Sequence, residues 1–132
     1  MTMKNLVVVC AVVCAIVLAP ALTNADKTFT GTRNATWDCA KEPNIHIMRG
    51  EGSYTFKGAC KVIAIEGGNN KLVIEAVELL QIVGAGNTVD VGTLDTVNVV
   101  GAKNQVTWKK ARSGDQPKTS AIGADNKLGQ AR

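Results

Sequence analysis

Two carboxylate side chains occupy matching positions in this 132-residue sequence. Glu78 and Asp95 each stand eleven residues after a glycine, and 17 residues separate them. If the chain stacks with this spacing, the two carboxylates come within about 5 Å of each other on an outer face and could bridge a calcium ion. A good calcium site needs more oxygen ligands, and Lys61 holds the matching position one turn earlier. Glu78 and Asp95 are therefore only weak metal candidates, and we expect no cofactor.

Catalytic chemistry has little support elsewhere in the sequence. His46 is the single histidine, and it lies between Ile45 and Ile47 in an alternating segment, which points it outward. The sequence contains no zinc-ligand spacing, phosphate-binding loop or hydrolase nucleophile elbow. We therefore expect no catalytic residues and a protein that is not an enzyme.

The first 25 residues have the composition of a secretory signal peptide. Lys4 is their only charge, an apolar run covers residues 6–22, and small residues stand at positions 23 and 25. The alternative is an uncleaved membrane anchor, although Pro20 suits a peptidase site better. We predict an exported protein whose domain comprises residues 26–132.

Two of the four cysteines lie in the predicted mature domain. Cys39 and Cys60 form an even pair, and an exported chain with such a pair usually contains one disulfide. The alternative is two buried thiols. We predict a Cys39–Cys60 disulfide.

The elements that position these side chains follow from a 17-residue repeat. Glycines recur at 50, 67, 84 and 101, and Asn70, Asn87 and Asn104 each stand three residues after one of them. A fixed period of this length is typical of stacked repeats. Gly and Asn both tolerate the positive φ of a sharp bend, and stacked asparagines can pass hydrogen bonds along a column. We interpret the three asparagines as a structural ladder.

Each repeat contains two short segments in which apolar residues alternate with polar ones. In the repeat that starts at position 84, Val89, Val91, Val97 and Val99 follow this pattern. Period two and abundant Val and Ile predict strands. We therefore predict an all-β fold, a small parallel β-solenoid with turns of about 17 residues. The alternative is an antiparallel β meander or sandwich.

The two ends of the predicted stack have distinct features. Trp37 and Trp108 occupy the same position in an early and a late turn, and we interpret them as end caps, with ligand stacking as the alternative. Residues 109–120 break the repeat and predict a protruding loop. Residues 101–132 contain seven Lys or Arg against two Asp, so this end could contact an anionic envelope polymer or a protein.

The segment GAKNQVTW at 101–108, preceded by GAGNTVDV, resembles a bacterial family of short exported domains known as domain of unknown function 3060. The resemblance covers roughly residues 33–130. It implies a secreted or envelope-associated, periplasmic or extracellular bacterial protein of all-β character. It brings no catalytic or binding residues with it.

Two functional hypotheses remain at this point. The first is a non-catalytic secreted or envelope-associated repeat module, either a structural spacer or a binder of a protein or glycan partner. The second is a small enzyme acting on cell-surface polysaccharide, with Glu78, Asp95 and the 109–120 loop as its site. We expect no nucleic-acid partner, since the chain has few aromatics and no recognisable module, and membrane contact only through an uncleaved N-terminal segment.

Overall fold

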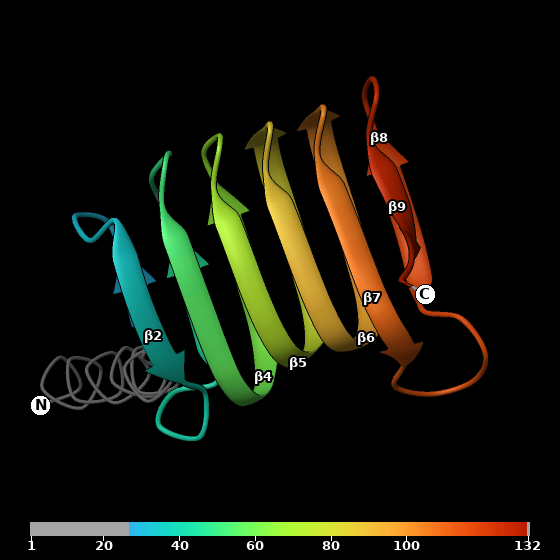
Figure 1. Ribbon diagram of the computed structural model, residues 1–132, viewed down its shortest axis with the longest axis horizontal. Coiled ribbons are helices and arrows are strands. Elements are labelled where there is room, and N and C mark those ends of the chain that lie inside the picture. Colours follow the sequence, from blue (N-terminus) through green and yellow to red (C-terminus); the bar gives the residue numbers. More distant parts are fainter. Residues whose placement is uncertain (1–26, 132) are drawn as a thin grey trace, which may run out of the picture.

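The computed structural model describes residues 27–131, and the predicted signal peptide, residues 1–25, lies outside the described residues. The described chain forms nine strands that wind into a β-solenoid (Figure 1). The strands are β1 (Lys27–Phe29), β2 (Asn34–Asp38), β3 (Asn44–Ile47), β4 (Ser53–Glu66), β5 (Lys71–Ala85), β6 (Thr88–Ala102), β7 (Gln105–Ala111), β8 (Lys118–Ile122) and β9 (Lys127–Gln130). All strand pairs are parallel, which confirms the predicted fold and contradicts the meander.

Each coil has two flat sides. The long strands β4, β5 and β6 bend in the middle, so that their first and second halves belong to opposite sides. The first halves stack with β2, β7 and β9, and we call this the first sheet. The second halves stack with β1, β3 and β8, and we call this the second sheet. A tight corner joins the second sheet of one coil to the first sheet of the next.

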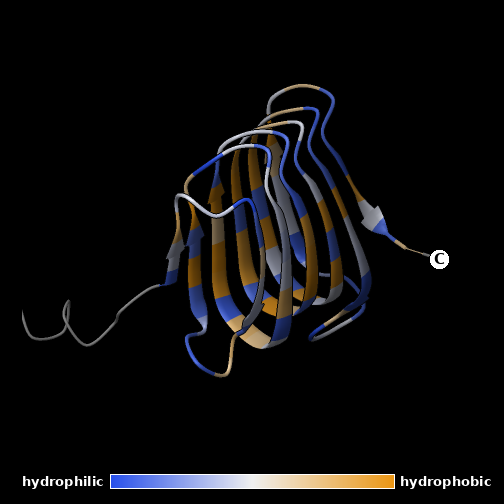
Figure 2. Ribbon diagram, turned by 60° about the vertical axis from the view of Figure 1, so that its left-hand side comes forward, coloured by the Kyte–Doolittle hydropathy of each residue, from blue (hydrophilic) through white to orange (hydrophobic). Residues whose placement is uncertain are grey.

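The predicted columns of equivalent residues are present. Leu72 pairs with Val89, Val89 with Val106, and Val106 with Leu128. Inward-facing residues such as these fill the space between the two sheets, and Leu72, Val89 and Val106 are completely buried. Figure 2 shows apolar and polar residues alternating along the strands. Stacking is what makes this core possible, since a single coil cannot bury its own apolar face.

One glycine of the sequence repeat is displaced by a residue from its predicted place. Arg49, not Gly50, is the equivalent of Gly67 in the next coil. The hydrogen bonds show this, since Nδ2 of Asn70 donates to the carbonyl of Arg49 at 2.8 Å, as Nδ2 of Asn87 does to the carbonyl of Gly67. The step between these two coils is 18 residues instead of 17. A β-bulge after Phe56 absorbs the additional residue.

The bulge is closed by a side chain from the next coil. The backbone N–H of Gly58 donates to Oε2 of Glu75 at 2.9 Å, and Gly58 has a φ of 78°. The carboxylate of Glu75 therefore replaces the backbone carbonyl that would accept from this N–H in an uninterrupted β ladder.

The corners stack more closely than any residue with a Cβ would allow. Gly84, Gly101 and Gly123 have φ values of 149°, 138° and 124°. A Cβ on any of them would overlap with the carbonyl oxygen of the glycine one coil earlier. Only glycine satisfies both the backbone conformation and the close approach.

The asparagine ladder runs beside the glycine column. Oδ1 of Asn87 accepts from the backbone N–H and from Nδ2 of Asn70, both at 3.1 Å. Asn104 does the same for Asn87, and Asn126 for Asn104. Asn87 also donates from Nδ2 to the carbonyl of Gly67 at 3.0 Å. The buried amides are thus fully hydrogen-bonded, as buried polar groups must be to avoid a desolvation cost.

Four of the five aromatic residues gather at the N-terminal end. The ring of Phe29 packs against those of Trp37, Tyr54 and Phe56, and the amine of Lys27 lies 4.6 Å from the centre of the Trp37 ring. The Tyr54 hydroxyl donates to the carbonyl of Thr32 at 2.6 Å. Burial raises the pKa of this phenol, and nearby Arg49 opposes the shift.

Trp108 lies inside the stack and not at its end. It is 4% exposed and pairs with Val91 on one side and Gln130 on the other, because β9 adds a further strand beyond β7. The irregular loop is also shorter than predicted. Residues 109–111 continue β7, and residues 118–120 belong to β8, which leaves 112–117 as the connection.

We expect Gly84→Ala to destabilise the fold by at least about 3 kcal/mol, because it adds a Cβ where the φ is positive and a carbonyl already fills the space. Gly31→Ala is the matched control, since a Cβ at Gly31 meets nothing within 4 Å. Its free energy of unfolding should change by no more than about 0.5 kcal/mol. Urea unfolding of both variants checks this, and equal losses would contradict the role of the glycine column.

Candidate functional site

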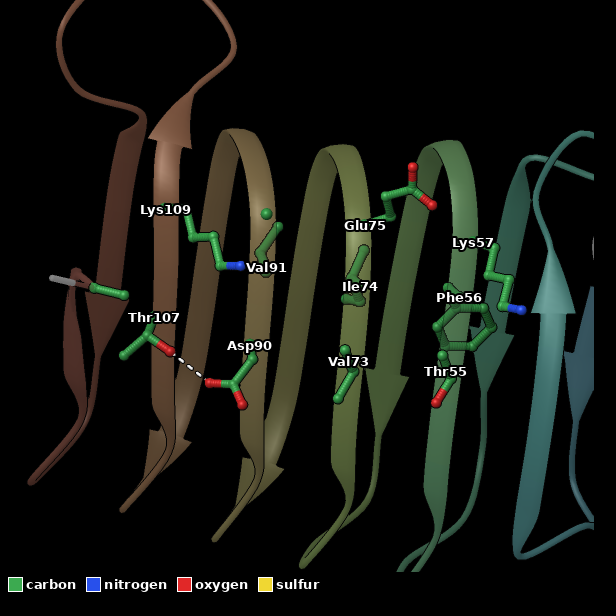
Figure 3. A pocket seen from close by; sticks show the side chains of 12 residues that line it. Thr55, Phe56, Lys57, Val73, Ile74, Glu75, Asp90, Val91, Thr107 and Lys109 are labelled. Carbon is green, nitrogen blue, oxygen red and sulfur yellow. Dashed lines mark hydrogen bonds between the residues drawn. The ribbon is translucent and has the colours of Figure 1, made fainter.

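The outer face of the first sheet contains a shallow groove of about 540 Å³ that crosses four coils (Figure 3). It lies over the first halves of β4, β5 and β6 and over β7, close to the bend. The groove is lined by Thr55, Phe56, Lys57, Val73, Ile74, Glu75, Asp90, Val91, Gly92, Thr107, Lys109 and Ala131. Sequence analysis did not single out these residues, because their positions show no repeated residue type.

Two outward-facing columns of residues form the groove. One contains Thr55, Val73, Asp90 and Thr107, which follow from the strand register. The other brings Lys57, Glu75 and Lys109 to the bend side, as the labelled side chains in Figure 3 show. The first column therefore presents a hydroxyl, an apolar, an acidic and a second hydroxyl side chain in succession. The second column carries both positive and negative charges.

Gly92 opens the middle of the groove. It occupies the place between Glu75 and Lys109 in the bend-side column, and it contributes no side chain there. A Cβ at this position would overlap with the carbonyl oxygen of Glu75. The close stacking of two coils therefore requires glycine at position 92. Because this glycine has no side chain, a gap separates the acidic Glu75 from the basic Lys109.

Several groups of the groove are already positioned by hydrogen bonds. The Thr107 hydroxyl donates to Oδ1 of Asp90 at 2.6 Å, and Oε2 of Glu75 holds the Gly58 amide. Val73, which is 48% exposed, gives the floor an apolar patch. A groove with fixed acceptors, two lysines and an apolar patch can bind an elongated ligand that carries hydroxyl and charged groups.

The carboxylate pair found in the sequence lies at the bend, outside this groove. The register places Glu78 beside Asp95, and the Arg112 guanidinium forms an ion pair with Glu78. The backbone of Arg112 is held by the Leu94 carbonyl at 2.9 Å, which aligns it with Asp95. The hydrogen bond and charge of Glu78, and then the charge of Asp95, raise the pKa of Arg112.

An arginine therefore stands beside the two acids that we considered as calcium ligands. Arg112 stands eleven residues after Gly101, in the same phase as Glu78 and Asp95, so the 17-residue spacing could have predicted this pairing. Sequence analysis missed it because residues 109–120 were assigned to a loop. Glu78 and Arg112 border a second groove of about 410 Å³, whose lining also includes Lys61, Ala59 and Ala76. Among residues 27–131, no group of three or more His, Cys, Asp or Glu could hold a metal ion.

The remaining predicted residues lie apart from both grooves or beneath them. Cys39 and Cys60 form the predicted disulfide, with Cα atoms 5.0 Å apart, and each is 1% exposed. His46 points outward from the second sheet, and its Nε2 lies 2.6 Å from Oε2 of Glu66. In the described part of the chain, no helix has the length and apolarity needed to cross a membrane.

One known protein family matches part of the chain. Residues 76–125 match the family described as Protein of unknown function (DUF3060). The resemblance predicted from the sequence is thereby confirmed for this segment. The matched segment runs from the second half of β5 through β8 to the following corner. It includes Gly84, Gly101 and Gly123 of the glycine column and Asn87 and Asn104 of the asparagine ladder. No curated protein and no solved structure matches the chain significantly.

Because Arg112 already pairs with Glu78 and its positive charge lies near Asp95, we expect millimolar calcium to leave the thermal midpoint of the protein unchanged. Arg112→Ala should lower that midpoint, and the loss should shrink in high salt as the repulsion between Glu78 and Asp95 is screened. Lys110→Ala, which changes a neighbouring exposed lysine, is the control. A clear stabilisation of the wild type by calcium would show that the two acids bind metal despite Arg112.

Proposed function

We propose that the chain is an exported, non-catalytic β-solenoid module that binds an elongated, hydroxyl-rich and charged polymer of the cell envelope along the first sheet. The observation that carries the proposal is the groove itself. It runs across four coils and arranges lysines, carboxylates and hydroxyl groups at the regular spacing of the strands. Strands about 4.8 Å apart place equivalent groups at intervals that an extended polymer can follow.

The rigidity of the groove supports binding to a polymer. The strands β4, β5 and β6 beneath the groove each pair with a neighbouring strand on both sides. The core beneath is completely packed, since Ile74 and Val91 are 2% and 3% exposed. A preformed surface loses little conformational entropy on binding, so weak contacts along several coils can add up.

Export is supported by the disulfide. Cys39–Cys60 joins the loop after β2 to the bend of β4, and it is buried against the core. Structural disulfides persist in oxidising compartments and are rare in reducing ones. Together with the apolar N-terminal segment seen in the sequence, this favours a periplasmic or extracellular location.

Simultaneous replacement of Lys57 and Lys109 by alanine should reduce binding to insoluble cell-wall polysaccharide at least about fivefold, because both lysines border the groove and can pair with anionic groups of the polymer. Co-sedimentation of the protein with the polymer measures the bound fraction. Lys71→Ala is the matched control, because Lys71 is exposed on the same sheet but does not line the groove.

Two results would contradict the binding proposal. The first is an equal loss of binding in the Lys71→Ala variant, which would indicate unspecific charge attraction. The second is release of soluble fragments from the polymer by the wild type, which would favour the alternative of a small polysaccharide-cleaving enzyme.

The export proposal has its own test. Protein recovered from the periplasm or medium of a bacterial host should have no free thiol at Cys39 or Cys60, and Cys39→Ala with Cys60→Ala should lower its free energy of unfolding by about 3 kcal/mol. Thiol labelling after cell fractionation and urea unfolding measure the two effects. Recovery of the folded protein in the cytoplasm with both thiols free would overturn export.

A further inference from the structure

The C-terminal end of the solenoid presents two open strand edges. Within residues 27–131, β8 pairs only with β6 and β9 only with β7. The inward-facing Thr119 and Ala121 of β8 are exposed, whereas Val97 and Val99 beneath them are 0% and 1% exposed. The inward-facing side of β8 is therefore left without a neighbouring coil within the described residues. An open edge of this kind is a template for a further strand.

The backbone hydrogen bonds between the strands show which N–H and C=O groups of β8 and β9 face the open edge. The amides of Lys127 and Ala131 bond back to the preceding coil, at 2.8 and 2.6 Å. Because successive amides of a strand point to opposite sides, those of Leu128 and Gln130 face the open edge. In the second sheet, the amide of Met48 bonds back to Phe29, and Ile122 is the equivalent of Met48.

The same alternation therefore decides which groups of β8 are free. Because Ile122 is the equivalent of Met48, its amide points back toward β6. The amides and carbonyls of Thr119 and Ala121 then face the open edge. An antiparallel second copy of β8, centred on Ser120, would place Thr119 opposite Ala121 of that copy. Such a pair exchanges two hydrogen bonds, and the arrangement repeats on the other side of the centre.

One rotation axis satisfies both sheets. Ser120 lies three residues before the corner that begins at Gly123, and Gly129 lies three residues after the corner that ends at Asn126. The two residues therefore stand at the same height in opposite sheets. A twofold axis that is perpendicular to the sheets and passes near both would continue β8 with β8 and β9 with β9.

The side chains agree with this symmetry. On the outer surface Lys118 would lie opposite Ile122 of the second copy, and Ser120 opposite Ser120, so no like charges face each other directly. On the inner surface the small Thr119 and Ala121 would meet and close the core. Figure 1 shows the loop of residues 112–117 below β8 and β9, at the bend side, where it also reaches past their open edge; the middle of both strands stays open.

We propose that two copies of this chain associate through the open edges of β8 and β9, with a twofold axis near Ser120 and Gly129, to form a continuous double-length solenoid. The contact is isologous: it uses the C-terminal end of each of the two copies, so the association stops at a dimer. Because only two short strands from each copy take part, the interface lies at the small end of specific interfaces, and we expect a concentration-dependent equilibrium.

Light scattering of the full chain over a range of concentrations tests the association. The wild type should approach twice the mass of one chain, and Ala121→Pro should remain at the mass of one chain. Proline at this position removes an amide that faces the open edge and no bond to β6, so the thermal midpoint should stay close to that of the wild type. Val83→Lys is the control, because it disrupts the exposed apolar residues of the second sheet away from β8.

Cross-linking tests the axis and does not depend on the proline variant. With Cys10 and Cys14 replaced by serine, Ser120→Cys should form a disulfide-linked dimer in oxidised glutathione, since residues on the axis face each other. Lys118→Cys should not, since its equivalent in the second copy lies about 14 Å away along the strand. Peptide mapping identifies the joined residues.

A wild type that stays at the mass of one chain at all concentrations would overturn the proposal. So would a dimer that Val83→Lys dissociates and Ala121→Pro does not, because the association would then use the face of the second sheet. Equal cross-linking of the Ser120→Cys and Lys118→Cys variants would overturn the twofold axis.

Discussion

The close approach of successive corners is the constraint on which the rest of this structure depends. A carbonyl oxygen of one coil occupies the space where a Cβ of the next coil would lie, so the column from Gly67 to Gly123 consists of glycine alone. Beside it, the amides of Asn87 and Asn104 each bond both to the asparagine of the next coil and to a glycine carbonyl of the preceding one. These two columns hold the coils in register, and the register determines every other neighbour relation.

The register turns a simple alternation of residues into two kinds of surface. Inward columns of Val, Leu and Ile form a core with no room for solvent, and the buried asparagines have all their polar atoms paired. Outward columns are free to vary, because a change there disturbs neither the core nor the ladder. The groove of the first sheet arises where such columns combine exposed charges, a hydroxyl pair and the missing side chain of Gly92. Function at this surface is therefore a matter of which residues share a column.

The same stacking gives the two ends of the molecule different characters. Phe29, Trp37 and Tyr54 cover the N-terminal coil with aromatic rings and bury its core. At the other end β8 continues the pattern of coils, but its inward positions carry small residues and remain exposed. A solenoid is stable only where each coil has a neighbour, so an uncovered coil is a natural contact surface.

The sequence by itself determined the repeat, the strand character, the paired cysteines and the asparagine column, because these follow from residue types that recur at one spacing. It placed Gly50 one residue away from its true equivalent, since the bulge at Gly58 is visible only when the neighbouring coil is present. It also assigned Trp108 to an end, although Gly123 and Asn126 repeat the spacing of the earlier corners and β9, which follows them, stacks beyond Trp108.

Only the tertiary structure decided which outward residues meet. Arg112 joins Glu78 from 34 residues away, and Lys57, Glu75, Asp90 and Lys109 become neighbours along the coil axis. These side chains differ in type from coil to coil, so a search for recurring residue types does not single them out, although Glu78, Asp95 and Arg112 share the 17-residue spacing. Residues that support the stack must be alike from coil to coil, whereas residues that form a surface need only be adjacent, and adjacency is a property of the folded chain.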